Sequence, residues 1–559
     1  MSRLFLALLV AVLSMASPAA GEDVARNGMV VAQEARAARI GVEILERGGN
    51  AVDAAVATGF ALAVTYPRAG NIGGGGYMVI HLANGRRDIA IDYRETAPRA
   101  TTRDIFLDEN GNADPRKSRD SALSIGVPGT VAGLALAHRR YGSGRFPLAD
   151  LLAPAIRLAG EGFPIEDDLA ETLPRTSARL ARWPSSARIF LKPDGGAFAP
   201  GDTLVQRDLA STLEAIARGG ARAFYDGPVA DKLAAGIQAA GGIMTREDLR
   251  DYRPVVRKPV RGSYRGHSIV SMPPSSSGGV VLIEMLNILE GYKLGQLEQA
   301  PRLHLMIEAM KRAYADRATY LGDPAVVSAP IARLMSKRYA ASLRAGIDRE
   351  RATPSTQIRA GVAEPREGDN TTHFSVVDRH GNAVANTYTL NFSYGLGLVA
   401  EGTGVLLNNE LDDFAANPSA PNAAGLVGGD ANAPGPGKRP LSSMSPTIVL
   451  KDGRPVIVTG SPGASRIITA VLQIVLNVVD LKMPIGEAVA ALRIHHQWSP
   501  DQVAAERGLP AGVIADLEMR GHKVTQGSPR TSANSIMVTP QGFVGAADPR
   551  TRGALAAGY

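Results

Sequence analysis

The chain has 559 residues, no cysteine, and 61 Lys and Arg against 54 Asp and Glu, which leaves a formal net charge of +7 at pH 7. The absence of cysteine excludes disulfides, thiolate metal sites and a cysteine nucleophile. The basic residues form no long run, and aromatic residues make up only 5% of the chain. Nucleic-acid binding usually requires clustered basic charge beside stacking rings, so we expect no nucleic-acid partner.

The amino terminus has the order of a secretory signal. Met1-Ser-Arg3 is followed by the apolar residues 4–13 and then by small residues up to Gly21. The apolar run is much shorter than the roughly 20 residues of a spanning helix, although it could also serve as an anchor. We therefore predict a signal peptide at residues 1–21, a periplasmic or secreted mature protein, and no stable membrane insertion.

Helical patterns dominate the first two thirds of the chain. Small and apolar residues predict helices at 32–46, 51–64, 128–140, 148–160, 229–240, 279–291 and 300–321. The glycine run at 73–76 precedes a predicted strand at 77–82 and lacks the following Lys-Ser or Lys-Thr of a phosphate loop. We interpret these glycines as a tight turn.

The chain changes character after residue 347. Residues 347–370 are polar and contain Pro354 and Pro365, which is typical of an exposed, flexible linker. The stretches 372–378 and 383–390 then alternate around a Gly-Asn turn and predict a β-hairpin. Further strands are expected at 405–407, 447–450, 456–459, 535–538 and 543–546, with helices at 467–479 and 485–492. These runs predict an α+β protein whose sheets are covered by helices.

A flexible linker that leads into a strand beginning Thr371-Thr372 is the pattern of a self-cleaving hydrolase. The Thr371 hydroxyl can attack the peptide bond after Asn370, and hydrolysis of the resulting ester leaves Thr371 as a free amino-terminal nucleophile. Its α-amine or a neighbouring group can act as the base, so no distant histidine is required. Two adjacent threonines alone are also ordinary strand composition.

Longer motifs surround this threonine. They are TTHFSVVD at 371–378, TYTLN at 387–391, LNNELDDF at 407–414, RPLSSMSPT at 439–447, TGSPG at 459–463, DYRETAP at 92–98 and AGY at 557–559. In this order they resemble the gamma-glutamyltransferase family over nearly the whole chain after residue 21. The resemblance implies the four-layer αββα fold of amino-terminal nucleophile hydrolases, formed jointly by a large subunit (22–370) and a small catalytic subunit (371–559) of one precursor.

The resemblance implies an enzyme that transfers gamma-glutamyl groups from glutathione and other gamma-glutamyl compounds to amino acids, peptides or water, without cofactor or metal. Thr371 matches the family nucleophile, and Thr389 matches a threonine that hydrogen-bonds it. A four-residue hairpin loop places Thr389 opposite Thr372, whereas a three- or five-residue loop places it opposite Thr371. Gly463 and Ala464 match the oxyanion-hole donors, and their position before an apolar helix leaves N–H groups at the positive end of the helix dipole.

A free glutamyl group carries an α-carboxylate and an α-ammonium, so a selective site needs both donors and acceptors. The residues that match the family are Arg94, Ser442 and Ser443 for the carboxylate, and Asn391, Glu410 and Asp413 for the ammonium group. A guanidinium suits the first role because it binds a carboxylate through two parallel hydrogen bonds.

Three positions depart from the family pattern. Ala464 replaces a second glycine, which a backbone donor tolerates if φ is negative. Ala424, in the lid-like segment 421–432, replaces a gating tyrosine, so we expect a looser lid and more hydrolysis. Glu410 replaces a glutamine of several bacterial members and should favour a free α-amine. Adjacent histidines, His495 and His496, point in different directions in regular structure and lack a partner at metal-ligand spacing, so we expect a structural role.

Two other functions stay open. One is a glutaryl-type acylase of the same fold, against which Arg94, Glu410 and Asp413 argue. The other is an inactive, processed protein that binds gamma-glutamyl compounds, against which Thr371 and Thr389 argue.

Overall fold

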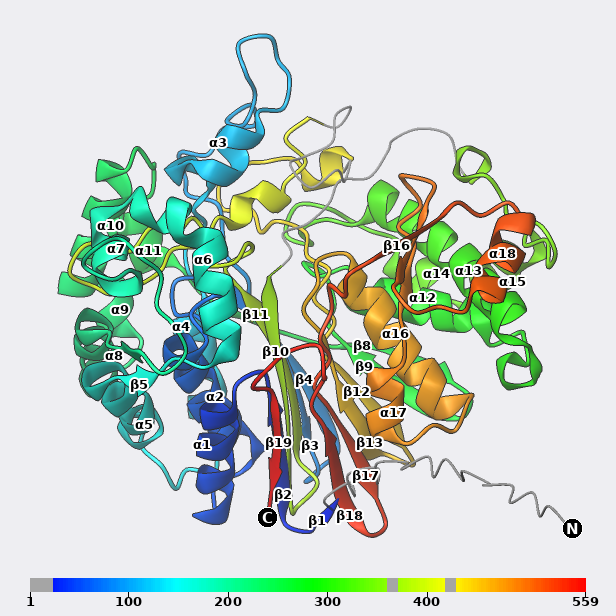
Figure 1. Cartoon of the computed structure of the whole chain (residues 1–559), viewed down its shortest axis with the longest axis horizontal. Coiled ribbons are helices and arrows are strands. Elements are labelled where there is room, and N and C mark those ends of the chain that lie inside the picture. Colours follow the sequence, from blue (N-terminus) through cyan, green and yellow to red (C-terminus); the bar gives the residue numbers. More distant parts are fainter. Residues whose placement is uncertain (1–23, 359–369, 418–428) are drawn as a thin grey trace, which may run out of the picture.

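Two antiparallel sheets face each other at the centre of the computed structural model, and helices cover both outer faces (Figure 1). The structure describes residues 24–358, 370–417 and 429–559. The predicted signal peptide, residues 1–21, and Ala424 therefore lie outside the described residues. Among the described helices, none combines the length and the apolar character needed to cross a bilayer.

The first sheet holds the predicted hairpin at its centre, in the strand order β19-β2-β10-β11-β3-β4-β7. Its strands are β2 (Gly28–Ala32), β3 (Gly75–Leu82), β4 (Arg87–Tyr93), β7 (Val255–Arg257), β10 (Thr371–Asp378), β11 (Ala383–Thr389) and β19 (Leu555–Gly558). Every residue of β10 and β11 is buried, because both faces of these central strands are covered.

The second sheet has the order β1-β18-β17-β13-β12-β9-β8. Its strands are β1 (Val24–Ala25), β8 (Val260–Tyr264), β9 (His267–Ser271), β12 (Thr447–Lys451), β13 (Arg454–Thr459), β17 (Ser535–Thr539) and β18 (Gly542–Ala546). Short strands outside the two sheets are β5 (Phe163–Pro164), β6 (Thr203–Leu204), β14 (Ile494–His495), β15 (Val503–Glu506) and β16 (Val524–Gly527). Both large sheets combine strands from before and after residue 370, so neither part of the chain can complete a sheet alone.

One helical layer packs on the first sheet, at the left of Figure 1. It contains α1 (Ala35–Glu46), α2 (Ala51–Thr65), α4 (Thr130–Tyr141), α5 (Leu148–Glu161), α6 (Asp167–Ala181), α7 (Pro184–Phe190), α8 (Arg207–Gly219), α9 (Arg222–Tyr225), α10 (Pro228–Ala239) and α11 (Arg246–Asp251), with α3 (Pro115–Asp120) above it. All residues of α2 are buried, because the helix lies between β10, β11 and the helices outside it. Asn50 and Asp53 form a capping box that starts this helix.

The other helical layer packs on the second sheet, at the right of Figure 1. It contains α12 (Gly278–Leu289), α13 (Gln299–Tyr320), α14 (Ile331–Leu334), α15 (Lys337–Ala345), α16 (Arg466–Val479), α17 (Ile485–Ala490) and α18 (Ala511–Met519). Separate apolar clusters fill the space between each helical layer and its sheet and the space between the sheets. The expected αββα layers are therefore confirmed.

Alternation along β10 decides which way Thr371 faces. Phe374 and Val376 belong to the cluster under the first helical layer, whereas Val377 belongs to the cluster between the sheets. Successive strand residues point to opposite faces, so Thr371, six residues before Val377, faces the second sheet. This orientation directs its side chain towards β12, β13 and the start of α16.

The predicted helices and the hairpin are confirmed, but the strand expected at 405–407 is wrong. Only an isolated bridge, Val399 to Leu406, forms there, because glycines with positive φ at 402 and 404 turn the chain. The first part of the predicted linker is mostly exposed, yet Ser355 in it is buried and donates its N–H to Asp501 Oδ2 at 2.8 Å. Residues 359–369 of the linker lie outside the described residues.

Candidate active site

A three-residue turn sets the register of the hairpin. The N–H of Asp378 donates to the carbonyl of Asn382 at 3.0 Å. The residue opposite Thr389 is therefore Thr371 and not Thr372. The Asp378 carboxylate accepts the N–H and the side-chain amide of Asn382 at 3.0 and 2.7 Å, which holds the turn closed. The structure thus selects one of the two registers that the sequence left open.

The carbonyl group of Asn370 accepts a hydrogen bond from a hydroxyl group. Thr389 Oγ1 donates to Asn370 O at 2.6 Å and accepts the N–H of Asn391 at 2.8 Å. Asn370 in turn donates its N–H to the Asn391 carbonyl at 3.2 Å. In the uncleaved chain the Thr389 hydroxyl therefore contacts the carbonyl that precedes Thr371, and polarises it.

An arginine that sequence reasoning missed holds the Asn370 side chain. Arg68 Nη2 donates to Asn370 Oδ1 at 2.8 Å, and Arg68 Nη1 donates to Asp168 Oδ1 at 3.0 Å. The guanidinium also lies 5.3 Å from the centroid of the Tyr66 ring, a cation–π distance. Arg68 and Asn370 are 302 positions apart, so no local pattern could have paired them.

A small pocket opens beside Thr371, with a volume of about 210 Å³ including the part open to solvent. Its lining residues are Thr371, Thr389, Arg94, Asn391, Glu410, Asp413, Ser442 and Ala464, together with Met444 and Ile467. It brings together eight of the ten residues predicted for the site, from segments before and after residue 370. Gly463 and Ser443 do not line it.

Arg94 is the fully buried centre of the pocket's charge cluster. Its Nη1 donates to Glu410 Oε1 at 2.5 Å, its Nη2 donates to Asp413 Oδ2, and its Nε donates to the Pro440 carbonyl at 3.2 Å. A third carboxyl group, that of Glu95, lies 3.9 Å from Nη1. Arg94, expected to bind the substrate carboxylate, is thus hydrogen-bonded to Glu410 and Asp413, which are expected to bind its ammonium group.

Carboxyl groups outnumber guanidinium groups in this cluster. Burial raises the pKa of Glu95 to about 8, against the opposing effect of Arg94, and burial also raises the pKa of Glu410 and Asp413. Both Glu95 oxygens, Glu410 Oε2 and Asp413 Oδ1 make no hydrogen bond within the described part of the chain. Arg94 contacts these carboxyl groups and Arg317 also lowers the pKa of Asp413, so the unbonded carboxyl oxygens are acceptors that an additional donor could satisfy.

The two serines differ in their contacts. Ser442 donates its N–H to Ser275 O at 3.1 Å, while its hydroxyl oxygen accepts the N–H of Met444 at 3.1 Å. The Ser442 hydroxyl proton can therefore point into the pocket. The Ser443 hydroxyl accepts Arg317 Nη2 at 3.2 Å and lies behind the pocket wall.

The turn before α16 has the backbone of an oxyanion site, with one strained residue. Within the described chain, the N–H groups of Gly463 and Ala464 make no hydrogen bond. Gly463 has φ +128°, and a Cβ there would lie 2.6 Å from Thr531 Cγ2. Ala464 has φ +55°, so the negative φ on which its tolerance depended is not found. A left-handed alanine costs about 1–2 kcal/mol, which this turn must absorb.

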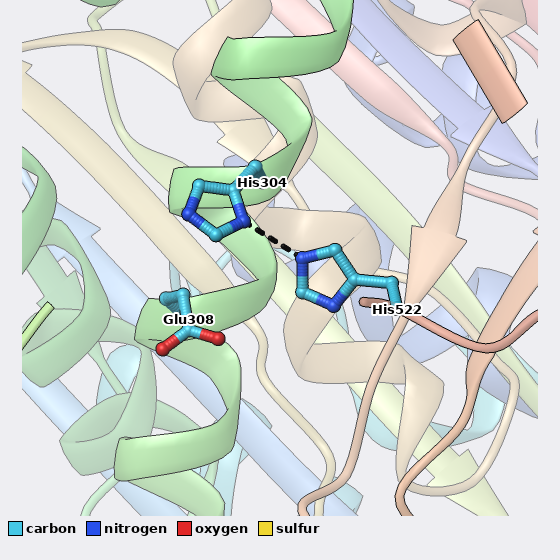
Figure 2. Close-up of side chains that lie close together, drawn as sticks. All are labelled: His304, Glu308 and His522. Carbon is cyan, nitrogen blue, oxygen red and sulfur yellow. Dashed lines mark hydrogen bonds between the residues drawn. The ribbon is translucent and has the colours of Figure 1, made fainter. Parts of the chain in front are cut away.

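A buried group of two histidines and a glutamate, which the sequence did not indicate, resembles a metal-ligand set (Figure 2). His304 Nδ1 lies 2.8 Å from His522 Nε2, and His304 Nε2 lies 2.8 Å from the Asp348 carbonyl. Because the carbonyl only accepts, His304 donates from Nε2, and His522 donates the proton that the two rings share. Burial lowers the pKa of both histidines.

The carboxylate of this group is already neutralised. Glu308 accepts Lys311 Nζ at 3.1 Å and the N–H of Thr353 at 3.0 Å on Oε1, and Arg312 Nη1 at 2.6 Å on Oε2. A divalent cation would meet two adjacent positive charges and would have to displace these bonds. We therefore interpret the group as an anchor for the segment around Thr353.

The adjacent histidines at the end of β14 make separate contacts, as expected for a structural role. His495 Nδ1 lies 3.0 Å from Thr469 Oγ1, and His496 Nε2 lies 3.1 Å from Asp501 Oδ1. Burial lowers the pKa of both rings, so they are neutral near pH 7.

The layered sheets and a pocket built around a hairpin threonine define an amino-terminal nucleophile hydrolase. The model of the family described as gamma-glutamyltranspeptidase matches residues 37–558, and the chain belongs to this family of enzymes. A glutathione hydrolase proenzyme from Escherichia coli is 51% identical over 96% of this chain and 92% of its own. An acylase ACY 1 proenzyme from a Pseudomonas strain is 40% identical over 94% of this chain and 93% of its own.

Solved structures agree. The cephalosporin acylase from Bacillus halodurans superposes with a TM-score of 0.83 and 29% identity over 96% of both chains. The gamma-glutamyltranspeptidase from Helicobacter pylori has a TM-score of 0.57 and 47% identity over 58% of this chain and 93% of its own.

Proposed function

We propose that the chain is a precursor that cleaves itself between Asn370 and Thr371 and then transfers gamma-glutamyl groups through a Thr371 ester. The observation that carries this proposal is the convergence of eight predicted residues on one pocket beside Thr371. The names of the curated relatives, glutathione hydrolase proenzymes, support it.

Self-cleavage uses groups already in contact. The Thr371 hydroxyl attacks the Asn370 carbonyl carbon while Thr389 Oγ1, 2.6 Å from the carbonyl oxygen, stabilises the negative charge that develops there. Arg68 fixes the Asn370 side chain and so limits rotation of the scissile bond. The C–N bond breaks and the released Thr371 nitrogen takes the hydroxyl proton, which frees the α-amine. Water then hydrolyses the ester to an Asn370 carboxylate and the Thr371 hydroxyl.

Transfer repeats this chemistry on an external substrate. The free α-amine of Thr371 accepts the hydroxyl proton as the oxygen attacks the gamma-carbonyl, and the N–H groups of Gly463 and Ala464 stabilise the oxyanion. The leaving amine takes the proton, and a gamma-glutamyl ester remains on Thr371. An amino acid, a peptide or water then attacks this ester and regenerates the threonine.

The Arg94 cluster would select the glutamyl group. Its surplus of carboxyl groups, with Glu410 and Asp413 each using one oxygen on Arg94, provides acceptors for an α-ammonium, and Asn391 borders the same pocket. Arg94 and Ser442 would receive the α-carboxylate, with Ser443 behind them. The substrate therefore replaces part of an existing ion cluster instead of entering an uncharged space.

The acylase relatives keep a glutaryl-type acylase as the second candidate. A glutaryl group lacks the α-ammonium, so it would bring no donor to Glu410 Oε2 and Asp413 Oδ1. We expect gamma-glutamyl anilide to be hydrolysed with a much higher kcat/KM than glutaryl anilide. Equal rates would reject the gamma-glutamyl assignment and favour the acylase.

The cleaved chain should persist as a heterodimer of residues 22–370 and 371–559, because both sheets need strands from each part. We further propose that it acts in the periplasm or outside the cell, after removal of residues 1–21, on glutathione and on amino-acid or peptide acceptors. Two bands on a denaturing gel that co-elute in gel filtration would support the heterodimer. Elution of separate subunits would contradict it.

A further inference from the structure

A second cavity opens at the end of the sheets opposite Thr371, among the turns that lie at the bottom of Figure 1. It is bounded by β1 and by the turns β3–β4, β10–β11, β12–β13 and β17–β18, and its volume is about 1610 Å³ including the part open to solvent. Val377 in its wall is six residues from Thr371 along β10, or about 20 Å at the rise of a strand. The cavity is therefore separate from the pocket of the proposed function.

The charged groups in this cavity are all of one sign. Its basic side chains are Arg26, Arg86, Arg379 and Arg454, with His81 and His380, and no described residue that lines it is acidic. The four arginines are exposed, and none forms an ion pair with a carboxylate in the described part of the chain. We name these four residues the arginine rim.

The described acids in or beside the bordering turns form no ion pair with the rim, and Asp452, exposed in the β12–β13 turn, does not line the cavity. Asp378 accepts the N–H groups of Ala51 and His380 at 3.0 and 2.9 Å, and Asp88 pairs with His81 and Arg261. The rim therefore keeps its positive charge in the free protein.

Contacts between the turns bring the rim together. Arg86 Nη1 lies 3.0 Å from the position of a Cβ on Gly453, so this side chain crosses from the β3–β4 turn to the residue before Arg454. The N–H of Ala83, in the same turn, donates to Asn382 Oδ1 at 3.0 Å, beside the β10–β11 turn that carries Arg379. Turns from both sheets thus present guanidinium groups to one space.

Burial and the positive charge of the cavity lower the pKa of a histidine in its wall. The pKa of His81 falls to about 4, first because the ring is buried and then because Arg261 and Arg86 oppose a further positive charge. The inner wall is apolar, with buried Val377, Pro455 and Phe543. Low-polarity walls strengthen the attraction of the rim for anions.

We propose that the arginine rim binds a phosphate-bearing anion with at least two negative charges. A guanidinium donates two parallel hydrogen bonds to a phosphate group. Four guanidinium groups in one cavity carry more positive charge than a single carboxylate would neutralise. The phosphate could belong to a soluble molecule or to the headgroup of an anionic lipid, which offer the same chemistry. Binding here is independent of gamma-glutamyl transfer.

Calorimetric titration of the processed enzyme with inorganic pyrophosphate at low ionic strength tests this proposal. We expect saturable binding that weakens as salt is added, because these charges are exposed. The double variant Arg379→Gln/Arg454→Gln should bind at least tenfold more weakly. A matched control, Arg175→Gln/Arg218→Gln, removes two exposed arginines from α6 and α8 and should bind as the wild type does.

Co-sedimentation with vesicles of cardiolipin, whose headgroup carries two phosphates, and with phosphatidylcholine vesicles distinguishes the two phosphate sources. If the protein binds the anionic vesicles, if the rim variant does not, and if pyrophosphate competes with the vesicles, the ligand is a lipid headgroup. If the protein binds pyrophosphate but not the anionic vesicles, the ligand is a soluble phosphate. Absence of binding to both probes, or equal binding by the rim and control variants, overturns the proposal. Unchanged release of aniline from gamma-glutamyl anilide in the rim variant shows that the variant is folded. If the proposed transfer activity proves to be absent, the binding measurements still test the arginine rim.

Discussion

Arg68→Ala should slow self-cleavage, because Arg68 is the described side chain that grips the residue before the scissile bond. Its Nη2 donates to Asn370 Oδ1 at 2.8 Å, and Asp168 fixes the other end of the guanidinium at 3.0 Å. Without it, Asn370 would keep only its backbone contacts to the hairpin, and the carbonyl would leave the attack geometry more often.

The size of the effect follows from that single bond. A hydrogen bond to a charged group contributes about 1.5–3 kcal/mol. The Arg68 side chain is 22% exposed, so solvent competes for the bond and the lower end applies. Since about 1.4 kcal/mol corresponds to a factor of ten in rate, cleavage should be roughly tenfold slower.

The assay is a time course of precursor conversion into two bands on a denaturing gel, in a double-mutant cycle with Asn370→Ala. If Arg68 acts through Asn370, Arg68→Ala slows cleavage of the wild type but adds little to Asn370→Ala. Arg68→Lys should recover part of the rate, since lysine keeps one charged donor. If Arg68→Ala is cleaved at the wild-type rate, or if the effects of the two substitutions on the cleavage rate are fully additive, Arg68 does not act through Asn370.

Three further changes test the pocket. Gly463→Ala places a Cβ 2.6 Å from the Thr531 side chain. It should lower kcat for gamma-glutamyl anilide by about 100-fold, which is the usual effect of losing one oxyanion-hole donor. An unchanged kcat would contradict the assignment of Gly463 to the oxyanion hole. Arg94→Ala strands buried Glu410 and Asp413 and should lower the free energy of unfolding in urea by about 3–5 kcal/mol, and a loss below 1 kcal/mol opposes the buried cluster. Burial raises the pKa of Glu95 from 4.5 to about 8, so between pH 4.5 and 8 the folded state binds a proton that the unfolded state has released. The free energy of unfolding of the wild type should therefore fall as pH rises through this range, and that of Glu95→Gln should fall less. Parallel plots of unfolding free energy against pH for the two proteins would count against the shift.

The sequence predicted the parts of this protein whose signals are local. Periodicity located α2, α13 and α16, and the Gly-Asn turn located the β10–β11 hairpin. The register needed the structure, because one turn residue decides whether Thr389 faces Thr371 or Thr372.

The family resemblance named most of the pocket, but it did not give the contacts. The pairing of Arg94 with Glu410, the grip of Arg68 on Asn370, and the positive φ of Ala464 depend on how distant segments fold together. Glu95 was visible beside Arg94, yet only its complete burial distinguishes it from a surface ion pair. These features are tertiary, and no local pattern encodes them.

The most direct test of the central claim compares purified wild type with Thr371→Ala on a denaturing gel and in a gamma-glutamyl anilide assay. We expect two bands and turnover for the wild type, and one full-length band without turnover for the variant, because the hydroxyl that cuts the chain is also the one that attacks the substrate. Two bands and anilide release from Thr371→Ala would contradict it.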